Sequence, residues 1–384
     1  MDADVYKKVV PTSESLAERM VYGTDASCIE GNAAAVVWPS DYEQIKQVIR
    51  LASREDLPIV ARGGGTSLVG GAVSKNALVM DMARLNKIRK LFVGEKMAIV
   101  QSGVILDQLN SALAEFNLEF PVIPSSHAAC TIGGMIATNA LGKIPSREGW
   151  MKEWVKDLTF IDGTGKVFTI DGNEARRFMD TEGCCGIIIE ATLRLMNKHN
   201  YTTDLFKFSD IPSLMAKVKE LADSKDTAAV EFISRHAAKI LGLGSSDMLL
   251  VRYYSNKGAI DHEEAEKLWQ TYDNIYSLIV NAGYPKAEDP LFDKDVDKFL
   301  DWLDKQEIPS HGRIAVGSVQ PYLRSAADEE KMILAVNELK GRVAGAHGLG
   351  LLRKKYANLG VSQNMKEFKL KYDPKNLLNK GKVV

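Results

Sequence analysis

The chain has 384 residues, of which 45% are apolar and 26% are charged, an ordinary globular composition that excludes low-complexity disorder and collagen-like repeats. This length predicts two or three domains. The 49 basic and 50 acidic residues leave a net charge of −1, which argues against a nucleic-acid-binding protein held mainly by charge.

Predicted helices and strands alternate over the first half of the chain. Ser40 and Glu43 form a capping-box pattern before apolar residues at helical spacing, from Ile45 to Ala52. Residues 156–170 predict a hairpin that turns at Asp162-Gly163-Thr164-Gly165. Apolar runs predict strands at 57–61, 78–80, 98–100 and 187–193, and a helix at 104–116. This mixture is typical of an α+β fold.

A polar cluster at residues 196–203 predicts a domain boundary. Beyond it, strands are predicted at 204–208, 229–233, 248–254 and 313–319, and helices at 213–222, 261–279 and 325–340. This order predicts an antiparallel sheet covered by helices.

The cysteines and the apolar runs exclude several classes of protein. Cys28, Cys130, Cys184 and Cys185 form no paired CxxC motifs, so we expect free thiols and neither structural zinc nor an iron–sulfur cluster in this chain. The start lacks a secretory apolar stretch, and no apolar run approaches the roughly 18 residues of a membrane span. We therefore expect a cytoplasmic protein that is not integral to a membrane.

Three glycine-rich segments carry the strongest signals of ligand binding. In the first, the predicted strand at 57–61 leads into Arg62-Gly63-Gly64-Gly65-Thr66-Ser67. Consecutive glycines allow backbone N–H groups to converge on an anion, and the hydroxyls add donors. The loop is neither a P-loop nor Gly-x-Gly-x-x-Gly. Taken alone, it indicates a phosphate-binding loop or a flexible turn.

The other two segments follow at residues 124–140 and 182–188. The second begins Pro124-Ser125-Ser126 and has no helical or strand period, so it could line an extended ligand or be an ordinary loop. The third, Glu182-Gly183-Cys184-Cys185-Gly186-Ile187-Ile188, turns into a predicted buried strand. Its backbone could lie against a base or ring, or it could simply lead into a core strand.

In this order and at these spacings, the three segments resemble the flavoprotein family of FAD-linked oxidases and dehydrogenases related to vanillyl-alcohol oxidase. The likeness is strongest to the glycolate oxidase and D-lactate dehydrogenase branch, whose ending resembles His347-Gly348-Leu349-Gly350 and residues 373–382. The match covers residues 20–195 and the last forty well, and the middle poorly. It implies a two-part FAD-binding domain of the PCMH type over 1–197, a cap domain over 198–340, and a segment at 341–384 that returns to the flavin.

The resemblance implies one FAD per chain. Covalent relatives bond the flavin to a histidine where this chain has Thr66, so we expect dissociable FAD. Cys130 lies one residue from the cysteinyl link of some relatives, and we interpret it as an ordinary small buried residue. The residues implied to bind FAD are Arg62, Gly63, Gly64, Gly65, Thr66, Ser67, Pro124, Ser125, Ser126, Thr131, Gly134, Thr138, Gly183, Gly186, Ile188 and Asn379.

The chain departs from the metal-dependent members of this branch. Those members hold a divalent ion with a His-x-Gly-Asp-Gly-Asn-x-His strand and a Glu-His pair. Here Arg313 and Gln320 replace both histidines of the strand, and Ala346 replaces the glutamate before His347. Arginine repels a divalent cation and alanine has no ligand atom, so we predict that no metal binds here.

Three residues are candidates for catalysis. FAD accepts a hydride, so the protein must orient a C–H bond and remove the alcohol proton. The resemblance places His347 as the proton acceptor, although it could be a hydrogen-bonded structural histidine. Arg313 could bind a substrate carboxylate with two donors, or it could form a surface or interdomain ion pair. His311 is a weaker alternative base.

The sequence therefore predicts an FAD-dependent dehydrogenase that oxidises a 2-hydroxy acid of the lactate or glycolate class and passes the electrons to a separate acceptor. The alternative is a flavin-bearing electron-transfer subunit of a larger iron–sulfur complex, with an altered substrate pocket. The replaced metal ligands favour this alternative or a different alcohol.

Overall fold

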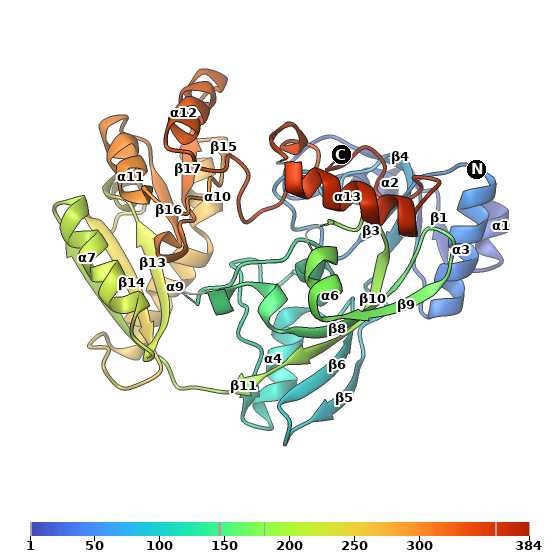
Figure 1. The fold of residues 1–384 in the computed structure, drawn as a ribbon, viewed down its shortest axis with the longest axis horizontal. Helices are drawn as coiled ribbons and strands as arrows, with labels where there is room; N and C mark the ends of the chain where they lie inside the picture. The colour runs from blue at the N-terminus through green and yellow to red at the C-terminus, as the bar shows by residue number, and fades with distance from the viewer. Residues whose placement is uncertain (1, 145–146, 180, 358, 384) are drawn as a thin grey trace.

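The computed structural model of the chain describes residues 2–144, 147–179, 181–357 and 359–383 (Figure 1). Helices are combined with parallel and antiparallel strands, which confirms the predicted α+β class. In Figure 1 a six-stranded sheet and its helices lie on the left, and two smaller sheets lie on the right. Within the described ranges, no helix combines the length and apolarity needed to cross a membrane.

A four-stranded sheet carries the first glycine-rich loop. The strand order is β1-β2-β4-β3, and β2, β4 and β3 are parallel. Helix α3 packs on the sheet through fully buried residues that include Ile45 and Ile49. Since β3 ends at Arg62, the loop begins at the carboxyl end of a parallel strand. The elements are α1 (Ala3–Lys7), β1 (Thr12–Ser13), α2 (Leu16–Gly23), β2 (Asn32–Val37), α3 (Tyr42–Arg54), β3 (Ile59–Arg62) and β4 (Lys75–Asp81).

A five-stranded antiparallel sheet packs beside it, in the order β5-β6-β10-β8-β9. The predicted hairpin is confirmed as β8 and β9, with Val167 paired to Ile161 across the turn. Its elements are β5 (Ile88–Phe92), β6 (Met97–Gln101), α4 (Leu106–Ala114), α5 (Ile132–Ala137), β8 (Val155–Ile161), β9 (Val167–Asp171), α6 (Gly172–Phe178), β10 (Ile187–Arg194) and α13 (Leu359–Tyr372). The short strands β7 (Leu118–Glu119) and β11 (Met196–Asn197) pair separately, and η1 (Arg147–Gly149) and η2 (Met151–Glu153) are single 3₁₀ turns.

The six-stranded sheet is antiparallel and has helices on both faces, as predicted. Alternate residues of β13 divide between two cores: Val230 and Phe232 pack with α7, α11 and α12, whereas Ala229 and Ile233 pack with α8, α9 and α10. The strand order is β12 (Thr202–Phe208), β14 (Asp247–Tyr253), β13 (Thr227–Ile233), β16 (Ser310–Gly312), β17 (Gln320–Leu323) and β15 (Lys286–Ala287). The helices are α7 (Ile211–Ala222), α8 (Arg235–Ile240), α9 (His262–Asp273), α10 (Ile275–Asn281), α11 (Val296–Lys305) and α12 (Ala326–Glu338).

Two predicted elements of this sheet are wrong, and both errors matter for the site. The predicted strand at 313–319 is a 3₁₀ turn, η3 (Ile314–Val316), between β16 and β17. Gly317 closes the turn with φ 76°, and a Cβ there would lie 1.8 Å from the Phe292 carbonyl oxygen. The predicted helix at 261–279 is split into α9 and α10 at Asn274, whose side chain donates to the carbonyl of Gln270 at 2.8 Å.

A smaller correction concerns the start of α3. The N-cap is Asp41, whose side chain accepts a hydrogen bond from the Gln44 amide at 2.9 Å, and not Ser40. The Ser40 amide instead donates to the Gln44 side chain at 2.8 Å. The predicted free thiols are confirmed: none of the four cysteines forms a disulfide, and Cys130 is buried.

Candidate functional site

One cavity of about 400 Å³ gathers every residue that the sequence predicts to bind FAD or to act in catalysis. The glycine-rich loop after β3 lines one wall, and residues of β16, the β16–β17 connection and the α9–α10 junction line another. The predicted residues that line it are Arg62, Gly63, Gly64, Gly65, Thr66, Ser67, Pro124, Ser125, Ser126, Thr131, Gly134, Thr138, Gly183, Gly186, Ile188, His311, Arg313, His347 and Asn379.

The first two glycines of the loop are packed against the second glycine-rich segment. A Cβ added to Gly63 would lie 2.2 Å from the Thr131 hydroxyl oxygen. A Cβ added to Gly64 would lie 2.0 Å from the carbonyl oxygen of Ala129. No side chain fits between the two segments, so the glycines are required for this close approach.

Arg62 and three unpaired amides make the loop an anion-binding nest. Gly65 has φ 66°, and a Cβ there would lie 2.2 Å from Arg62 Nη2, so the guanidinium packs against the loop. Its Nη1 donates to the carbonyl of Thr24. Within the part of the chain that the structure describes, the N–H groups of Gly64, Gly65 and Thr66 donate no hydrogen bond. Successive free amides beside a cation fit a pyrophosphate.

Among the buried polar atoms of the cavity that lack a hydrogen-bond partner within the described residues, two have no ion-pair contact either. Ser102 Oγ and His311 Nδ1 have no hydrogen-bond partner among the described residues, and both residues line the cavity. Because buried polar groups almost always have a partner, these two atoms indicate a bound ligand. Free amides, hydroxyls and a guanidinium are the donors that a dinucleotide with a diphosphate requires, so the cavity fits FAD.

Asn379 joins the C-terminal segment to the third glycine-rich turn. Its side-chain amide donates to the Glu182 carbonyl at 2.5 Å, and a Cβ on Gly183 would lie 3.3 Å from that nitrogen. Lys382, which the sequence analysis missed, donates to the Gly71 carbonyl at 2.7 Å. Burial lowers the pKa of Lys382 to about 8. The C-terminal segment therefore completes the cavity by specific polar contacts.

Gly186 has a structural role beside its place on the cavity. A Cβ on Gly186 would lie 2.4 Å from the ring of Phe160 and 3.0 Å from the ring of Phe178. Packing of the five-stranded sheet against α6 therefore already requires glycine at this position.

His347 is oriented by a carboxylate that the sequence analysis missed. The His347 amide donates to Asp289 Oδ2 at 2.5 Å, and His347 Nδ1 lies 3.2 Å from the same oxygen. Asp289 is 1% exposed and also forms an ion pair with buried Arg353. Burial lowers the pKa of His347; Asp289 opposes this change, whereas Arg353 and Arg313 add to it. The imidazole is therefore neutral at neutral pH, the form that accepts a proton.

Arg313 and His311 form the wall contributed by the six-stranded sheet. Arg313 Nε donates to Glu231 Oε1 at 3.3 Å, so its ion-pair partner is a buried residue of the six-stranded sheet. His311 lies between the rings of Tyr322 and Tyr272, with both ring centroids 5.5 Å away. Burial lowers the pKa of His311 well below its ordinary value, and the charge of Arg313 adds to the effect.

A further ion pair connects the second glycine-rich segment with α9. Lys143 Nζ lies 2.7 Å from Asp273 Oδ1, and His127 Nε2 lies 3.8 Å from Asp273 Oδ2. His127 Nδ1 lies 2.7 Å from Asp107 Oδ1. Hydrogen bonding to Asp273 raises the pKa of His127, against the effect of burial. This network fixes the end of α9, whose last residue lines the cavity.

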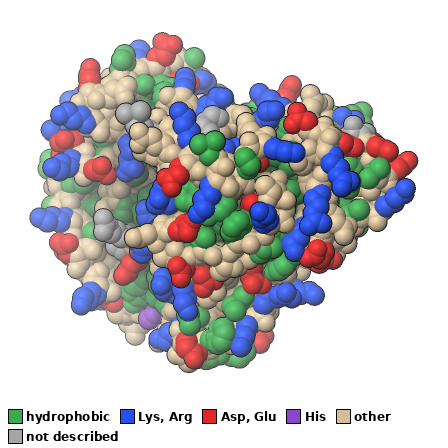
Figure 2. Space-filling model, turned by 45° about the vertical axis from the view of Figure 1, so that its right-hand side comes forward, with side chains coloured by type: hydrophobic (Ala, Val, Ile, Leu, Met, Phe, Trp, Pro, Cys, Tyr) green, Lys and Arg blue, Asp and Glu red, His purple; other side chains and the backbone are tan. Residues whose placement is uncertain are grey.

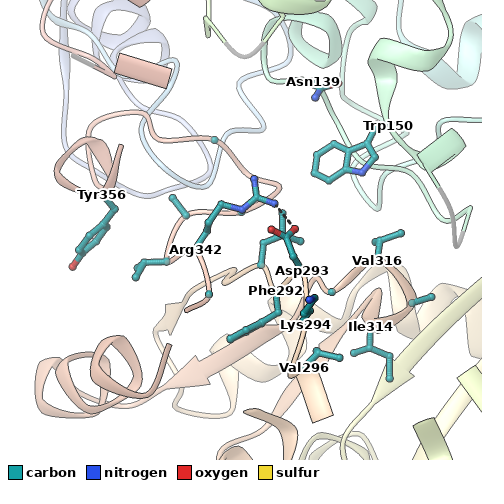
Figure 3. Close-up of a pocket in the computed structure, with 18 of the residues that line it drawn as sticks. Asn139, Trp150, Phe292, Asp293, Lys294, Val296, Ile314, Val316, Arg342 and Tyr356 are labelled. Carbon is teal, nitrogen blue, oxygen red and sulfur yellow. Dashed lines mark hydrogen bonds and ion pairs between the residues drawn. The ribbon is translucent and has the colours of Figure 1, made fainter. Parts of the chain in front are cut away.

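A second, larger cavity of about 970 Å³ adjoins the first, and Thr138 and Glu182 line both. Figure 3 shows Trp150 on one side of it and Phe292 and Ile314 on the other. Neither the second cavity nor its lining follows from the sequence motifs.

Basic and acidic side chains are interspersed over the face shown in Figure 2.

The described residues give no new evidence for a metal site. Among the described residues, no three His, Cys, Asp or Glu side chains gather in an arrangement that could hold a metal ion. The predicted absence of a metal beside Arg313 stays a prediction, which elemental analysis of the purified protein tests.

The fold and this cavity together define a flavin-dependent oxidoreductase. Residues 33–171 match the family described as FAD binding domain, and residues 319–383 match FAD linked oxidases, C-terminal domain. The chain is therefore an FAD-linked oxidoreductase that is similar to FAD-linked oxidases and dehydrogenases in both matched parts, and its cofactor is FAD. The predicted fold, a two-part FAD-binding domain of the PCMH type with a helix-covered antiparallel cap, is confirmed.

Known relatives extend over nearly the whole chain. D-lactate dehydrogenase of Archaeoglobus fulgidus is 28% identical and covers 91% of this chain and 91% of its own length. D-2-hydroxyglutarate dehydrogenase of Stutzerimonas stutzeri is 24% identical and covers 91% of this chain and 90% of its own length. Glycolate oxidase subunit GlcD of Bacillus subtilis is 26% identical over 96% and 93%. A structure of alkyldihydroxyacetonephosphate synthase shares the fold, with a TM-score of 0.70 over 96% of this chain and 82% of its own, at 16% identity.

We expect acid or heat to release intact FAD from the purified protein in a 1:1 ratio. The resemblance implies that Thr66 stands where covalent relatives carry the flavin-bonded histidine, and a hydroxyl there makes no such bond. Chromatography of the supernatant after acid precipitation measures the released flavin. Flavin that stays with the precipitate, or FMN in the supernatant, would contradict this expectation.

Proposed function

We propose that this chain is an FAD-dependent dehydrogenase that oxidises a small 2-hydroxy acid and passes the electrons to a separate acceptor. One observation carries the proposal: His347, oriented by Asp289, and Arg313 line the same cavity as the glycine-rich loop. A base and a carboxylate-binding cation beside a flavin site are what this oxidation needs.

Each of the two side chains has a defined task. The glycine-rich loop of residues 63–67 would hold FAD, which would supply the acceptor for the hydride of the α-carbon. We assign the ring proton of His347 to Nδ1, which lies 3.2 Å from Asp289 Oδ2, so that Nε2 accepts the proton of the substrate hydroxyl. The terminal nitrogens of Arg313 bind the carboxylate in a bidentate manner and hold the α-carbon in place. His311, neutral and without a partner at Nδ1, is the alternative base.

The relatives support this choice of substrate class. Three of them are named for the oxidation of D-lactate, D-2-hydroxyglutarate and glycolate, all 2-hydroxy acids. We further propose that residues 1–197 and 341–384 form the flavin-binding part and residues 198–340 the cap. This division assigns His347 to the flavin-binding part, and Arg313 and His311 to the cap.

We expect D-lactate, glycolate or D-2-hydroxyglutarate to bleach the flavin under anaerobic conditions. In Arg313→Met, the preference for an acid over its neutral amide, such as D-lactate over D-lactamide, should fall about ten- to a hundredfold, since a hydrogen bond to a charged group is lost. Rapid-mixing spectroscopy of flavin reduction measures both rates. Arg324→Met, at an exposed arginine directly after β17, is the matched control. An unchanged preference in Arg313→Met would remove Arg313 from substrate binding.

One observation favours a second candidate, an electron-transfer subunit of an iron–sulfur complex. Gln320 lines the cavity and is paired with His311 across β16 and β17, and Ala346 precedes His347. The resemblance implies that residues at the positions of Gln320 and Ala346 hold a metal in the metal-dependent relatives. Co-purification of an iron–sulfur protein, together with no bleaching by any acid of the panel, would favour this candidate over the dehydrogenase.

A further inference from the structure

A fully buried carboxylate lies directly behind Arg313. Glu231 is on β13, a central strand of the six-stranded sheet, and it has no exposed surface. Every other residue of this strand, Thr227–Ile233, is buried as well, and most of them are apolar. Since an ionised carboxylate is costly to bury, it persists at such a position only when its oxygens are paired.

Both oxygens of Glu231 accept a hydrogen bond. Oε1 accepts from Arg313 Nε at 3.3 Å, and Oε2 accepts from the Tyr272 hydroxyl. Two accepted hydrogen bonds suit a carboxylate, but burial raises the pKa of Glu231 against the opposing effects of the Arg313 charge and the Tyr272 hydrogen bond. Burial alone would lower the pKa of Arg313, but Glu231, Tyr272 and Asp273 together outweigh it, so the pKa is raised and the guanidinium stays charged.

The contact uses only one edge of the guanidinium. Within the described residues, Nε is the only Arg313 nitrogen with a hydrogen-bond partner, and Arg313 lines the flavin cavity whereas Glu231 does not. Arg313, His311 and His347 line the same cavity, and the charge of Arg313 contributes to lowering the pKa of both histidines.

We infer that Glu231 is a positioning residue, which holds Arg313 by Nε so that its two terminal nitrogens face the carboxylate of the substrate. The inference rests on the proposed role of Arg313 and goes beyond it by naming what sets the direction of the guanidinium. Tyr272 completes the arrangement by binding the second oxygen of Glu231.

Positioning and simple charge balance predict opposite effects. If Glu231 only neutralised Arg313, its removal would leave the site more positive, and anions would bind more tightly. If it positions Arg313, removal of the acceptor frees the side chain to rotate, and carboxylates bind more weakly. Glutamine keeps an oxygen acceptor without the charge, so Glu231→Gln separates the two effects.

The experiment uses the FAD-loaded protein and oxalate as a probe that needs no turnover, with binding followed by the change in flavin absorbance. In Glu231→Met we expect the Kd of oxalate to rise about ten- to a hundredfold, the scale of a lost charge-assisted hydrogen bond. Glu231→Gln should stay within about threefold of wild type, under 1 kcal/mol by the usual conversion. Glu220→Gln, at an exposed site on α7, is the control.

Two further measurements keep the inference falsifiable. In Glu231→Met/Arg313→Met, which buries no unpaired charge, oxalate should bind as weakly as in Arg313→Met alone. The flavin content of Glu231→Gln should match that of the wild type. Tighter oxalate binding in either single variant, or an additive loss in the double variant, would overturn the positioning role. Failure of every hydroxy acid to bleach the flavin would refute the proposed function while oxalate binding still reports on Glu231.

Discussion

Replacing His347 by asparagine should slow the reduction of the flavin by the best hydroxy acid by about 10²–10⁴-fold, the usual contribution of a general base. Asparagine keeps a polar side chain of similar size beside Asp289 but has no basic ring nitrogen. FAD should remain bound, because the anion-binding loop of residues 63–67 is a different wall of the cavity. Stopped-flow spectroscopy of the first reduction measures the effect.

His262→Asn is the matched control for that variant. His262 is exposed at the start of α9, so its replacement should leave the reduction rate unchanged. A rate for His347→Asn within about threefold of wild type, under 1 kcal/mol on the barrier, would remove His347 from the mechanism and direct attention to His311.

The pH dependence of reduction adds an independent readout. The pKa of His347 is lowered by burial, so the ring is neutral above its ordinary value of about 6.5 and stays neutral somewhat below it. The reduction rate should therefore be flat around neutrality and fall as the pH drops through a pKa below about 6.5. Asp289 raises this pKa, so Asp289→Asn should move the acid limb to still lower pH.

Replacing Gly64 by valine should abolish flavin binding. The added Cβ would lie 2.0 Å from the Ala129 carbonyl oxygen, a backbone atom that side-chain rotation does not remove. The loop and the second glycine-rich segment must separate, and the free amides of Gly64, Gly65 and Thr66 then no longer converge on a phosphate. The flavin-to-protein absorbance ratio after purification measures the loss.

Gly94→Val provides the control for that change. Gly94 lies in the turn between β5 and β6, and a Cβ there meets nothing within 4 Å. It should retain a full complement of FAD. Circular dichroism of Gly64→Val distinguishes a local loss of the nest from global unfolding. Normal flavin content in a folded Gly64→Val protein would show that this loop is not the phosphate site.

Local sequence patterns were enough to predict many of the helices and strands. Helix α3 and the β8–β9 hairpin were predictable because their signals, spaced apolar residues and an Asp-Gly turn, lie within a few residues of each other. The two errors lie at a glycine and an asparagine. Gly317, with a positive φ, ends η3 where a strand was predicted, and Asn274 separates α9 from α10 where one helix was predicted.

The residues around the site that sequence reasoning missed share a different property. Asp289 bonds His347 across 58 positions, Glu231 bonds Arg313 across 82, and Lys143 bonds Asp273 across 130. Their partners are set by tertiary packing, so no local pattern marks them. Of these residues, only Glu231 could have been noticed in the sequence, because it is a single acidic residue within an apolar run at 228–233.

The bond from Lys382 to the Gly71 carbonyl spans 311 positions. During translation, the nest around Gly64 therefore leaves the ribosome long before the residues that close the cavity are made. In a nascent chain that lacks residues 377–382 the cavity is incomplete, so we expect FAD to bind only after these residues have packed against β3. Such long-range closure is slow relative to local folding. On this order of events, the folded apoprotein precedes the FAD-loaded protein.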